Sequence, residues 1–139
     1  MEPTRVVLAD DHAIVRTSIR KVLDAAPEIE VVGEASNGLE AIDAVDHLAP
    51  DVLLLDMEMP VLSGIGVVRK LAATKSPVRI LALSAYDDHH FIQALLENGA
   101  SGYLTKDEAP KRVVEAIRRV ARGEKGLLSK RILKRLSYQ

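Results

Sequence analysis

The chain contains no cysteine, and this absence excludes disulfide bonds and thiol chemistry. A chain without cysteine fits a reducing compartment, so we expect a cytoplasmic protein. No apolar run approaches the roughly 20 residues that a transmembrane helix needs. The first residues also lack the pattern of a signal peptide. We therefore expect neither a membrane span nor export, and we see no internal repeat or low-complexity segment.

The 139 residues that are present suffice for one domain with a real core, and 47% of them are hydrophobic, which argues against disorder. The net charge of −1 hides a strong asymmetry. Residues 1–108 carry 18 Asp/Glu against 9 Lys/Arg, whereas residues 109–139 carry 2 against 10. The two parts therefore call for separate interpretations.

Short apolar runs alternate with stretches of helical period, and this alternation predicts the fold. Such a pattern favours a parallel sheet covered by helices on both faces. The predicted strands are Val6–Ala9, Val31–Ala35, Val52–Asp56, Ile80–Ser84 and Gly102–Thr105. The predicted helices are centred on residues 15–22, 39–45, 67–71, 91–96 and 113–120.

Polar residues follow the strands at their carboxyl ends. These residues are Asp10, Asp11, Asp56, Ser84 and Lys106. In open parallel sheets the working site lies beyond these ends, so we expect the five side chains to converge. Crowded carboxylates repel unless a cation lies among them, and Mg²⁺ prefers such oxygen ligands. An acid at a strand end is also often a helix cap, and this alternative stays open for Asp10 when that residue is considered by itself.

The cluster could support phosphoryl transfer. An aspartate beside Mg²⁺ can attack a phosphoryl group and become an aspartyl phosphate. Lys106 could neutralise the charged oxygens of that group, and Ser84 could donate a hydrogen bond to one of them. Gly64-x-Gly66 does not indicate a dinucleotide site, because it follows a loop and lacks the third glycine.

These residues stand within longer motifs, and as a set the motifs resemble the receiver domain of bacterial two-component response regulators, most closely the subfamily with a LuxR/NarL-type helix-turn-helix output. The resemblance covers residues 5–122. Its motifs are Val6-Val7-Leu8-Ala9-Asp10-Asp11-His12 with Arg16, Val32-Gly33-Glu34-Ala35 with Asn37-Gly38, Leu54-Leu55-Asp56-Met57-Glu58-Met59-Pro60 with Gly64, Ala82-Leu83-Ser84-Ala85, and Gly99-Ala100-Ser101-Gly102-Tyr103-Leu104-Thr105-Lys106.

The resemblance implies a flavodoxin-like, doubly wound α/β fold with five parallel strands in the order 2-1-3-4-5. It also implies roles for single residues. Asp56 is the phosphoacceptor, assisted by Lys106 and Ser84; Asp10, Asp11, Asp56 and the backbone carbonyl of Glu58 hold Mg²⁺; Ser84 and Tyr103 form the switch. Many receivers have proline after the lysine and a cis peptide bond there. Here Asp107 follows, and a cis bond before a residue other than proline costs roughly 3–4 kcal/mol, so none is assumed and the geometry of this bond stays open.

The same resemblance implies a signalling function. The domain would take a phosphoryl group from a sensor histidine kinase in a phosphorelay and control transcription. Enzyme activity would be limited to Mg²⁺-dependent self-phosphorylation and slow autodephosphorylation. Two alternatives remain. A dehalogenase-like phosphatase would need a second Asp two residues after its nucleophile, where this chain has Glu58. A degenerate receiver would act only in docking or dimerisation.

We expect two regions, a receiver at residues 1–123 and a basic linker at residues 124–139. The linker shows Leu128, Ile132 and Leu136 on one predicted helix face, and it would lead to a helix-turn-helix domain absent from this chain. DNA would be a partner only through that domain, and a homodimer could form on phosphorylation. The linker favours an excised receiver over a natural single-domain regulator.

Overall fold

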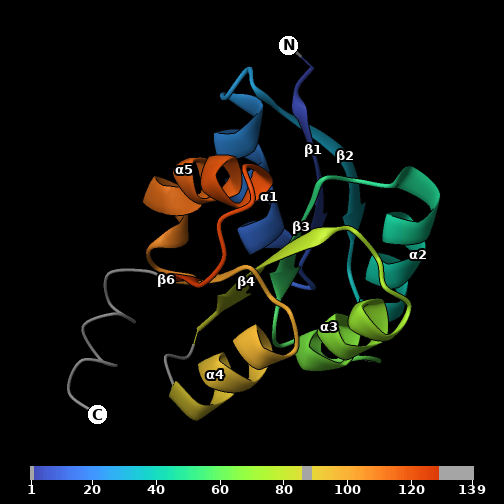
Figure 1. The fold of residues 1–139 in the computed structure, drawn as a ribbon. Helices are drawn as coiled ribbons and strands as arrows, with labels where there is room; N and C mark the ends of the chain where they lie inside the picture. Colours follow the sequence, from blue (N-terminus) through green and yellow to red (C-terminus); the bar gives the residue numbers. More distant parts are fainter. Residues whose placement is uncertain (1, 86–88, 129–139) are drawn as a thin grey trace.

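The structure is a computed structural model that describes residues 2–85 and 89–128. Within these residues, six parallel strands form one sheet in the order β2-β1-β3-β4-β5-β6 (Figure 1). The strands are β1 (Thr4–Ala9), β2 (Ile29–Ala35), β3 (Val52–Asp56), β4 (Arg79–Ser84), β5 (Gly102–Thr105) and β6 (Leu127–Leu128). The expected order 2-1-3-4-5 is confirmed for the first five strands.

Helices cover both faces of the sheet, as the alternating pattern predicts. Apolar residues of α1 and α5 form one core layer, and those of α2, α3 and α4 form the other. Figure 1 shows α1 and α5 together on one side of the strands, with α2 and α3 on the opposite side. The helices are α1 (Ala13–Asp24), α2 (Gly38–Leu48), α3 (Gly64–Ala73), α4 (His89–Glu97) and α5 (Ala109–Ala121).

Strand β3 lies at the centre, and its residues are all buried. Leu53 and Leu55 pack in the layer of α2, α3 and α4, whereas Val52 and Leu54 pack in the layer of α1 and α5. Burial on both faces explains why this strand is an unbroken apolar run rather than an alternating one. The same burial places Asp56, its last residue, at the edge of a fully apolar region.

Most strand bounds agree with the sequence prediction. The bounds of β3 and β5 are as predicted, but β1 begins at Thr4 and β2 at Ile29, two residues earlier than expected. Backbone pairing extends these strands through polar residues, which an apolar pattern does not register. For example, Thr4 pairs with Ile29 in the β1–β2 ladder.

The short strand β6 was not predicted, because residues 124–139 were assigned to a basic linker. Leu127 pairs with Gly102 on β5, and the Leu127 N–H donates to the carbonyl of Ser101 at 3.1 Å. The approach depends on Gly102, since a Cβ there would lie 2.8 Å from the Leu127 carbonyl oxygen. The linker helix predicted after Ser129 lies outside the described residues. Whether residues 1–123 form a separate unit stays a prediction.

Two other expectations concern the backbone and the membrane. Within residues 2–85 and 89–128 no peptide bond is cis, so the bond between Lys106 and Asp107 is trans. This agrees with the absence of proline after Lys106. In the same part of the chain, no helix has both the length and the hydropathy that a bilayer crossing requires.

The loop between β3 and α3 is closed by a local hydrogen bond. The N–H of Gly64 donates to the carbonyl of Met57 at 3.1 Å, and Ser63 caps α3 by accepting from the N–H of Gly66 at 3.4 Å. A Cβ on Gly64 would lie 2.7 Å from the Met57 Cα, whereas a Cβ on Gly66 would first meet the Cδ1 end of the Leu62 side chain. Backbone cannot move aside as a leucine methyl can, so the two glycines differ in tolerance.

This difference predicts opposite effects for two alanine substitutions in one helix. Gly64→Ala should lower the free energy of unfolding by about 1–3 kcal/mol through overpacking against the Met57 backbone. Gly66→Ala should be neutral or stabilising, because alanine is the better helix former by about 1 kcal/mol. Urea denaturation of both variants and the wild type measures the effect. Equal stability of the two variants would contradict this account of the loop.

Candidate functional site

Residues from four parallel strands meet at one edge of the sheet. Asp10 follows β1, Asp56 ends β3, Ser84 ends β4 and Lys106 follows β5. Because the strands are parallel, their carboxyl ends face the same way, and the predicted convergence of these side chains is found. The N–H of Lys106 donates to the carbonyl of Ser84 at 2.8 Å, so pairing of β4 with β5 extends as far as the site.

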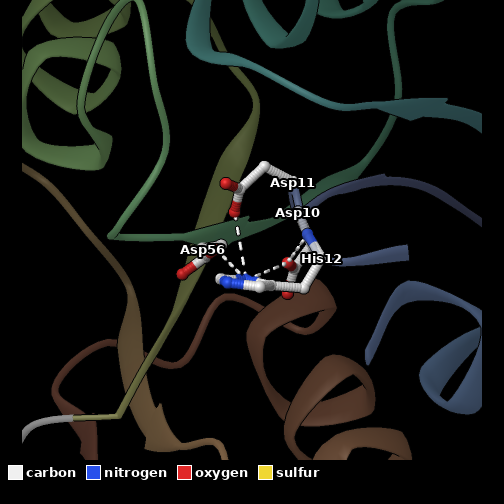
Figure 2. A group of neighbouring side chains, drawn as sticks. All are labelled: Asp10, Asp11, His12 and Asp56. Carbon is white, nitrogen blue, oxygen red and sulfur yellow. Dashed lines mark hydrogen bonds and ion pairs between the residues drawn. The ribbon is translucent and has the colours of Figure 1, made fainter. Parts of the chain in front are cut away.

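Acidic side chains form the centre of the site. Asp10 and Asp56 are fully buried, whereas the side chain of Asp11 is 29% exposed. Possible ligand atoms of these three residues and of His12 all lie within 4.8 Å of one another. Figure 2 shows the four side chains pointing toward a common point, with the imidazole among the carboxylates. Burying carboxylates this close together is costly unless positive charge or hydrogen bonds compensate.

Lys106 supplies part of the balancing positive charge. Its Nζ lies 3.0 Å from Asp56 Oδ1 and 3.8 Å from Asp10 Oδ2, and its side chain is only 18% exposed. One ammonium group thus faces two fully buried carboxylates. In this low-dielectric setting the remaining negative charge is costly, and a further cation would lower that cost.

The oxygen atoms that remain without hydrogen-bond partners fit such a cation. Among the described residues, neither Asp10 Oδ2 nor Asp56 Oδ2 has a hydrogen-bond partner, although both atoms are buried. Buried carboxylate oxygens are nearly always hydrogen-bonded or metal-bound. Oxygen donors at this spacing suit a hard divalent ion. The acidic cluster is therefore compatible with a metal site, with Asp11 giving access from solvent.

His12 is a member of the cluster to which the sequence prediction gave no role. Its Nδ1 lies 3.1 Å from Asp11 Oδ1, 3.4 Å from Asp10 Oδ1 and 3.9 Å from Asp56 Oδ2. The His12 side chain is 58% exposed. The backbone N–H of His12 donates to Asp10 Oδ1 at 2.8 Å. Its position directly after Asp10-Asp11 could have drawn attention to it, but only the structure shows where the ring points.

A second overlooked contact involves the side chain of Glu58. Its Oε1 accepts a hydrogen bond from the Ser84 hydroxyl at 2.6 Å and lies 3.3 Å from the N–H of Ala85. The Glu58 N–H in turn donates to Asp56 Oδ1 at 3.1 Å. Glu58 was expected to contribute only its backbone carbonyl, and that role stays a prediction. Its side chain instead connects the loop after β3 with the end of β4.

The ionisation of this acidic site follows from burial. Burial, together with the Glu58 side chain and the Asp10 charge, raises the pKa of Asp56 from 3.8 to about 8, although Lys106 opposes the rise. Burial would also raise the pKa of Glu58, but hydrogen bonds with Asp56 and Ser84 outweigh it and lower that pKa overall. The pKa values of the two carboxyl groups are therefore shifted in opposite directions, which makes Asp56 the more readily protonated of the pair.

Arg16 holds the backbone beside the acidic pair. Its Nη1 donates to the Asp10 carbonyl at 2.6 Å, and its Nε lies 3.0 Å from Glu34 Oε1. Glu34 also forms an ion pair with Arg20 at 2.8 Å, so two arginines of α1 bind the same glutamate near the end of β2. The sequence motif included Arg16 and Glu34 but did not show that they meet. The contact fixes the peptide that joins Asp10 to Asp11.

Tyr103, the predicted switch aromatic, is a core residue in this structure. It lies on β5, is fully buried, and belongs to the core layer that contains Ile92 and Leu95 of α4. Ser84, the last residue of β4, is also fully buried. Burial of the two residues does not distinguish a switch from ordinary core packing, so their role as a switch stays a prediction.

The raised pKa of Asp56 predicts a pH-dependent cost in stability. Between its unfolded pKa near 4 and its folded pKa near 8, the folded protein binds more protons than the unfolded chain, so stability falls as pH rises. Asp56→Asn removes this loss. In metal-free buffer we expect the advantage of the variant over the wild type to grow by about 1–3 kcal/mol between about pH 5.5 and about pH 8.5.

Urea denaturation at the two pH values, in chelator, measures this difference. Added Mg²⁺ should stabilise the wild type more at the higher pH, because the ion competes with the proton on Asp56. Asp51→Asn, at an exposed acid on the opposite edge of the sheet, is the control and should show no such growth with pH. Parallel pH profiles for wild type and Asp56→Asn would contradict the assignment.

Comparison with known proteins agrees with this geometry. The family model described as the response regulator receiver domain matches residues 6–118. The nitrate/nitrite response regulator protein NarL of Escherichia coli is 38% identical over 123 residues, which are 88% of this chain and 57% of that protein. The transcriptional regulatory protein LiaR of Bacillus subtilis is 36% identical over 137 residues, 96% of this chain and 65% of its own length.

A solved structure is similar over almost the whole chain. The two-component response regulator of the LuxR family from Aurantimonas sp. SI85-9A1 superposes with a TM-score of 0.91 at 31% identity, covering 99% of this chain and 97% of that one. By contrast, this chain spans less than two thirds of NarL and of LiaR. With the fold, the acidic cluster and the family match in agreement, the chain belongs to the receiver domains of response regulators, and its relatives are of the LuxR/NarL type.

Proposed function

We propose that this receiver domain is a phosphorylation-controlled switch in which Asp56 accepts the phosphoryl group. The observation that carries the proposal is the environment of Asp56. Its carboxyl group is fully buried at the exit of β3, lies 3.0 Å from Lys106 Nζ, and has one buried oxygen without a hydrogen-bond partner among the described residues. Receiver membership makes phosphorylation-dependent signalling the expected use of such a carboxylate.

The donor is a phosphohistidine of a sensor histidine kinase. A carboxylate oxygen of Asp56 attacks phosphorus, the bond from phosphorus to the histidine nitrogen breaks, and that nitrogen takes up a proton from solvent, so that histidine leaves as neutral imidazole. The product is an acyl phosphate on Asp56. Water later attacks the same phosphorus and returns the free carboxylate and inorganic phosphate. The domain contributes to both steps by its own residues, so self-phosphorylation and slow autodephosphorylation are its only catalysis.

Asp10, Asp11, Asp56 and the backbone carbonyl of Glu58 are the residues that would hold Mg²⁺. When bound, the ion supplies charge neutralisation for the phosphoryl oxygens. Lys106 would add a second positive charge, and its contact with Asp56 keeps the carboxylate oriented. Arg16 fixes the backbone between the two acids that follow β1, which limits the directions that Asp11 can adopt.

Ser84 and Tyr103 transmit the state of Asp56. Ser84 would donate its hydroxyl hydrogen to a phosphoryl oxygen, and Tyr103, buried on the neighbouring strand, would respond to the vacated space. This changes the surface of α4, β5 and α5, a two-state element biased by one covalent charge. As part of a longer response regulator, the domain would control a helix-turn-helix domain that binds DNA and regulates transcription in the cytoplasm, and a homodimer could form on phosphorylation.

Acetyl phosphate tests the proposed acceptor. Incubated with this small acyl phosphate and Mg²⁺, the wild-type domain should gain the mass of one phosphoryl group in intact mass spectrometry. Asp56→Asn should gain none, because an amide oxygen is not a nucleophile for this reaction. Chelation of Mg²⁺ should abolish the gain in the wild type. An equal gain in Asp56→Asn, or no gain in either protein, would rule out the proposal.

The role of Lys106 is tested by removing its charge. Lys106→Met retains the side-chain stem but not the ammonium group, so we expect phosphorylation by acetyl phosphate to slow by about tenfold or more, equivalent to about 1.4 kcal/mol in the barrier. Lys111→Met, at an exposed lysine of α5, is the matched control and should react at the wild-type rate. Equal slowing of the two variants would show a general charge effect instead.

A further inference from the structure

The Glu58 side chain occupies a defined place between Asp56 and Ser84. Its Oε1 accepts from the Ser84 hydroxyl at 2.6 Å, a short distance for two oxygen atoms. The same oxygen lies 3.3 Å from the N–H of Ala85, so two groups at the end of β4 hold it. Glu58 Oε2 is buried and has no hydrogen-bond partner among the described residues. This side chain is therefore held inside the site rather than extended into solvent.

The contact creates a competition for one hydrogen atom. A serine hydroxyl has a single O–H donor. While that hydrogen points to Glu58, it cannot point to a phosphoryl oxygen on Asp56. The glutamate backbone is tied to the same aspartate, because the Glu58 N–H donates to Asp56 Oδ1 at 3.1 Å. Glu58, which accepts the hydrogen bond from the Ser84 hydroxyl, is thus only two residues after the phosphoacceptor Asp56 in the sequence.

We propose that Glu58 is a positioning residue that holds the Ser84 hydroxyl away from Asp56 until a phosphoryl group displaces it. The proposal rests on Asp56 and Ser84 having the roles given above. A phosphoryl group would bring negative charge close to the Glu58 carboxylate, and this repulsion favours movement of Glu58 out of the site. The hydroxyl would then be released to the new acceptor. Glu58 thereby opposes formation of the activated arrangement and makes it depend on the phosphoryl charge.

A simpler explanation must be separated from this one. Removing Glu58 also removes a negative charge from a site that takes an anion, which alone would strengthen binding. The two effects differ in their dependence on Ser84. A charge effect remains when the hydroxyl is absent, whereas a competition for the hydroxyl hydrogen disappears with it. A double-mutant cycle measures this difference directly.

The experiment uses beryllofluoride, a phosphoryl mimic, with Mg²⁺ and four proteins: wild type, Glu58→Ala, Ser84→Ala and the double variant. Apparent affinity is obtained from the rise in melting temperature with ligand concentration. Glu58→Ala should bind about fivefold to tenfold more tightly than the wild type, since the lost hydrogen bond no longer opposes binding. In the Ser84→Ala background the same substitution should change the affinity less than about twofold.

A third substitution separates the charge of Glu58 from its hydrogen bond with Ser84. Glu58→Gln removes the charge but keeps a side-chain oxygen that can accept from the hydroxyl, so its gain in affinity should be clearly smaller than that of Glu58→Ala. Equal gains for Gln and Ala, or equal gains with and without the Ser84 hydroxyl, would overturn the proposal. If the wild type bound no beryllofluoride, the proposed function itself would fail, which is a distinct result.

Discussion

The site depends on a single imbalance of charge. Two fully buried carboxylates, Asp10 and Asp56, share one partly buried ammonium group, Lys106. A buried charge without a partner is among the most costly features that a folded protein can contain. The surrounding strands are packed on both faces of the sheet. The two carboxylates therefore stay buried, and the energetic cost of burying them remains. The consequence is a site whose energy falls when it gains a proton, a cation or a covalent bond at Asp56.

The fold that bears this cost is largely readable from sequence. Unbroken apolar runs such as Leu53–Leu55 indicate strands buried on both faces, and helical spacing between them indicates the crossovers, so the parallel sheet and its working edge follow. Strand β6 was beyond this reasoning. Two residues carry no period, and their pairing depends on the space that Gly102 leaves for Leu127, a tertiary contact. The early starts of β1 and β2 were missed for a related reason, since backbone pairing does not require apolar side chains.

The membership of the site was predictable, but its internal contacts were not. Sequence position determines which strand end carries Asp10, Asp56, Ser84 and Lys106, and parallel strands then bring those ends together. It does not determine rotamers. The sequence position of Glu58 is the same whether its carboxylate faces solvent or contacts Ser84. The 2.6 Å contact depends on the packing and the charges around the side chain. His12 is similar, because its place after the acidic pair does not reveal that its ring points back among the carboxylates.

The contact of Glu58 with Ser84 also bears on how a small covalent change can move a large core. Ser84 and Tyr103 lie on adjacent strands, with Ser84 paired to Thr105, and both are fully buried. A densely packed interior does not deform continuously, so a change at Ser84 must be taken up by a discrete rearrangement of its neighbours. Such a device needs its inactive arrangement to be held by a definite interaction, or thermal motion would populate both arrangements. A hydrogen bond worth about 1 kcal/mol or more biases the two populations several-fold, and the phosphoryl charge then has to reverse that bias.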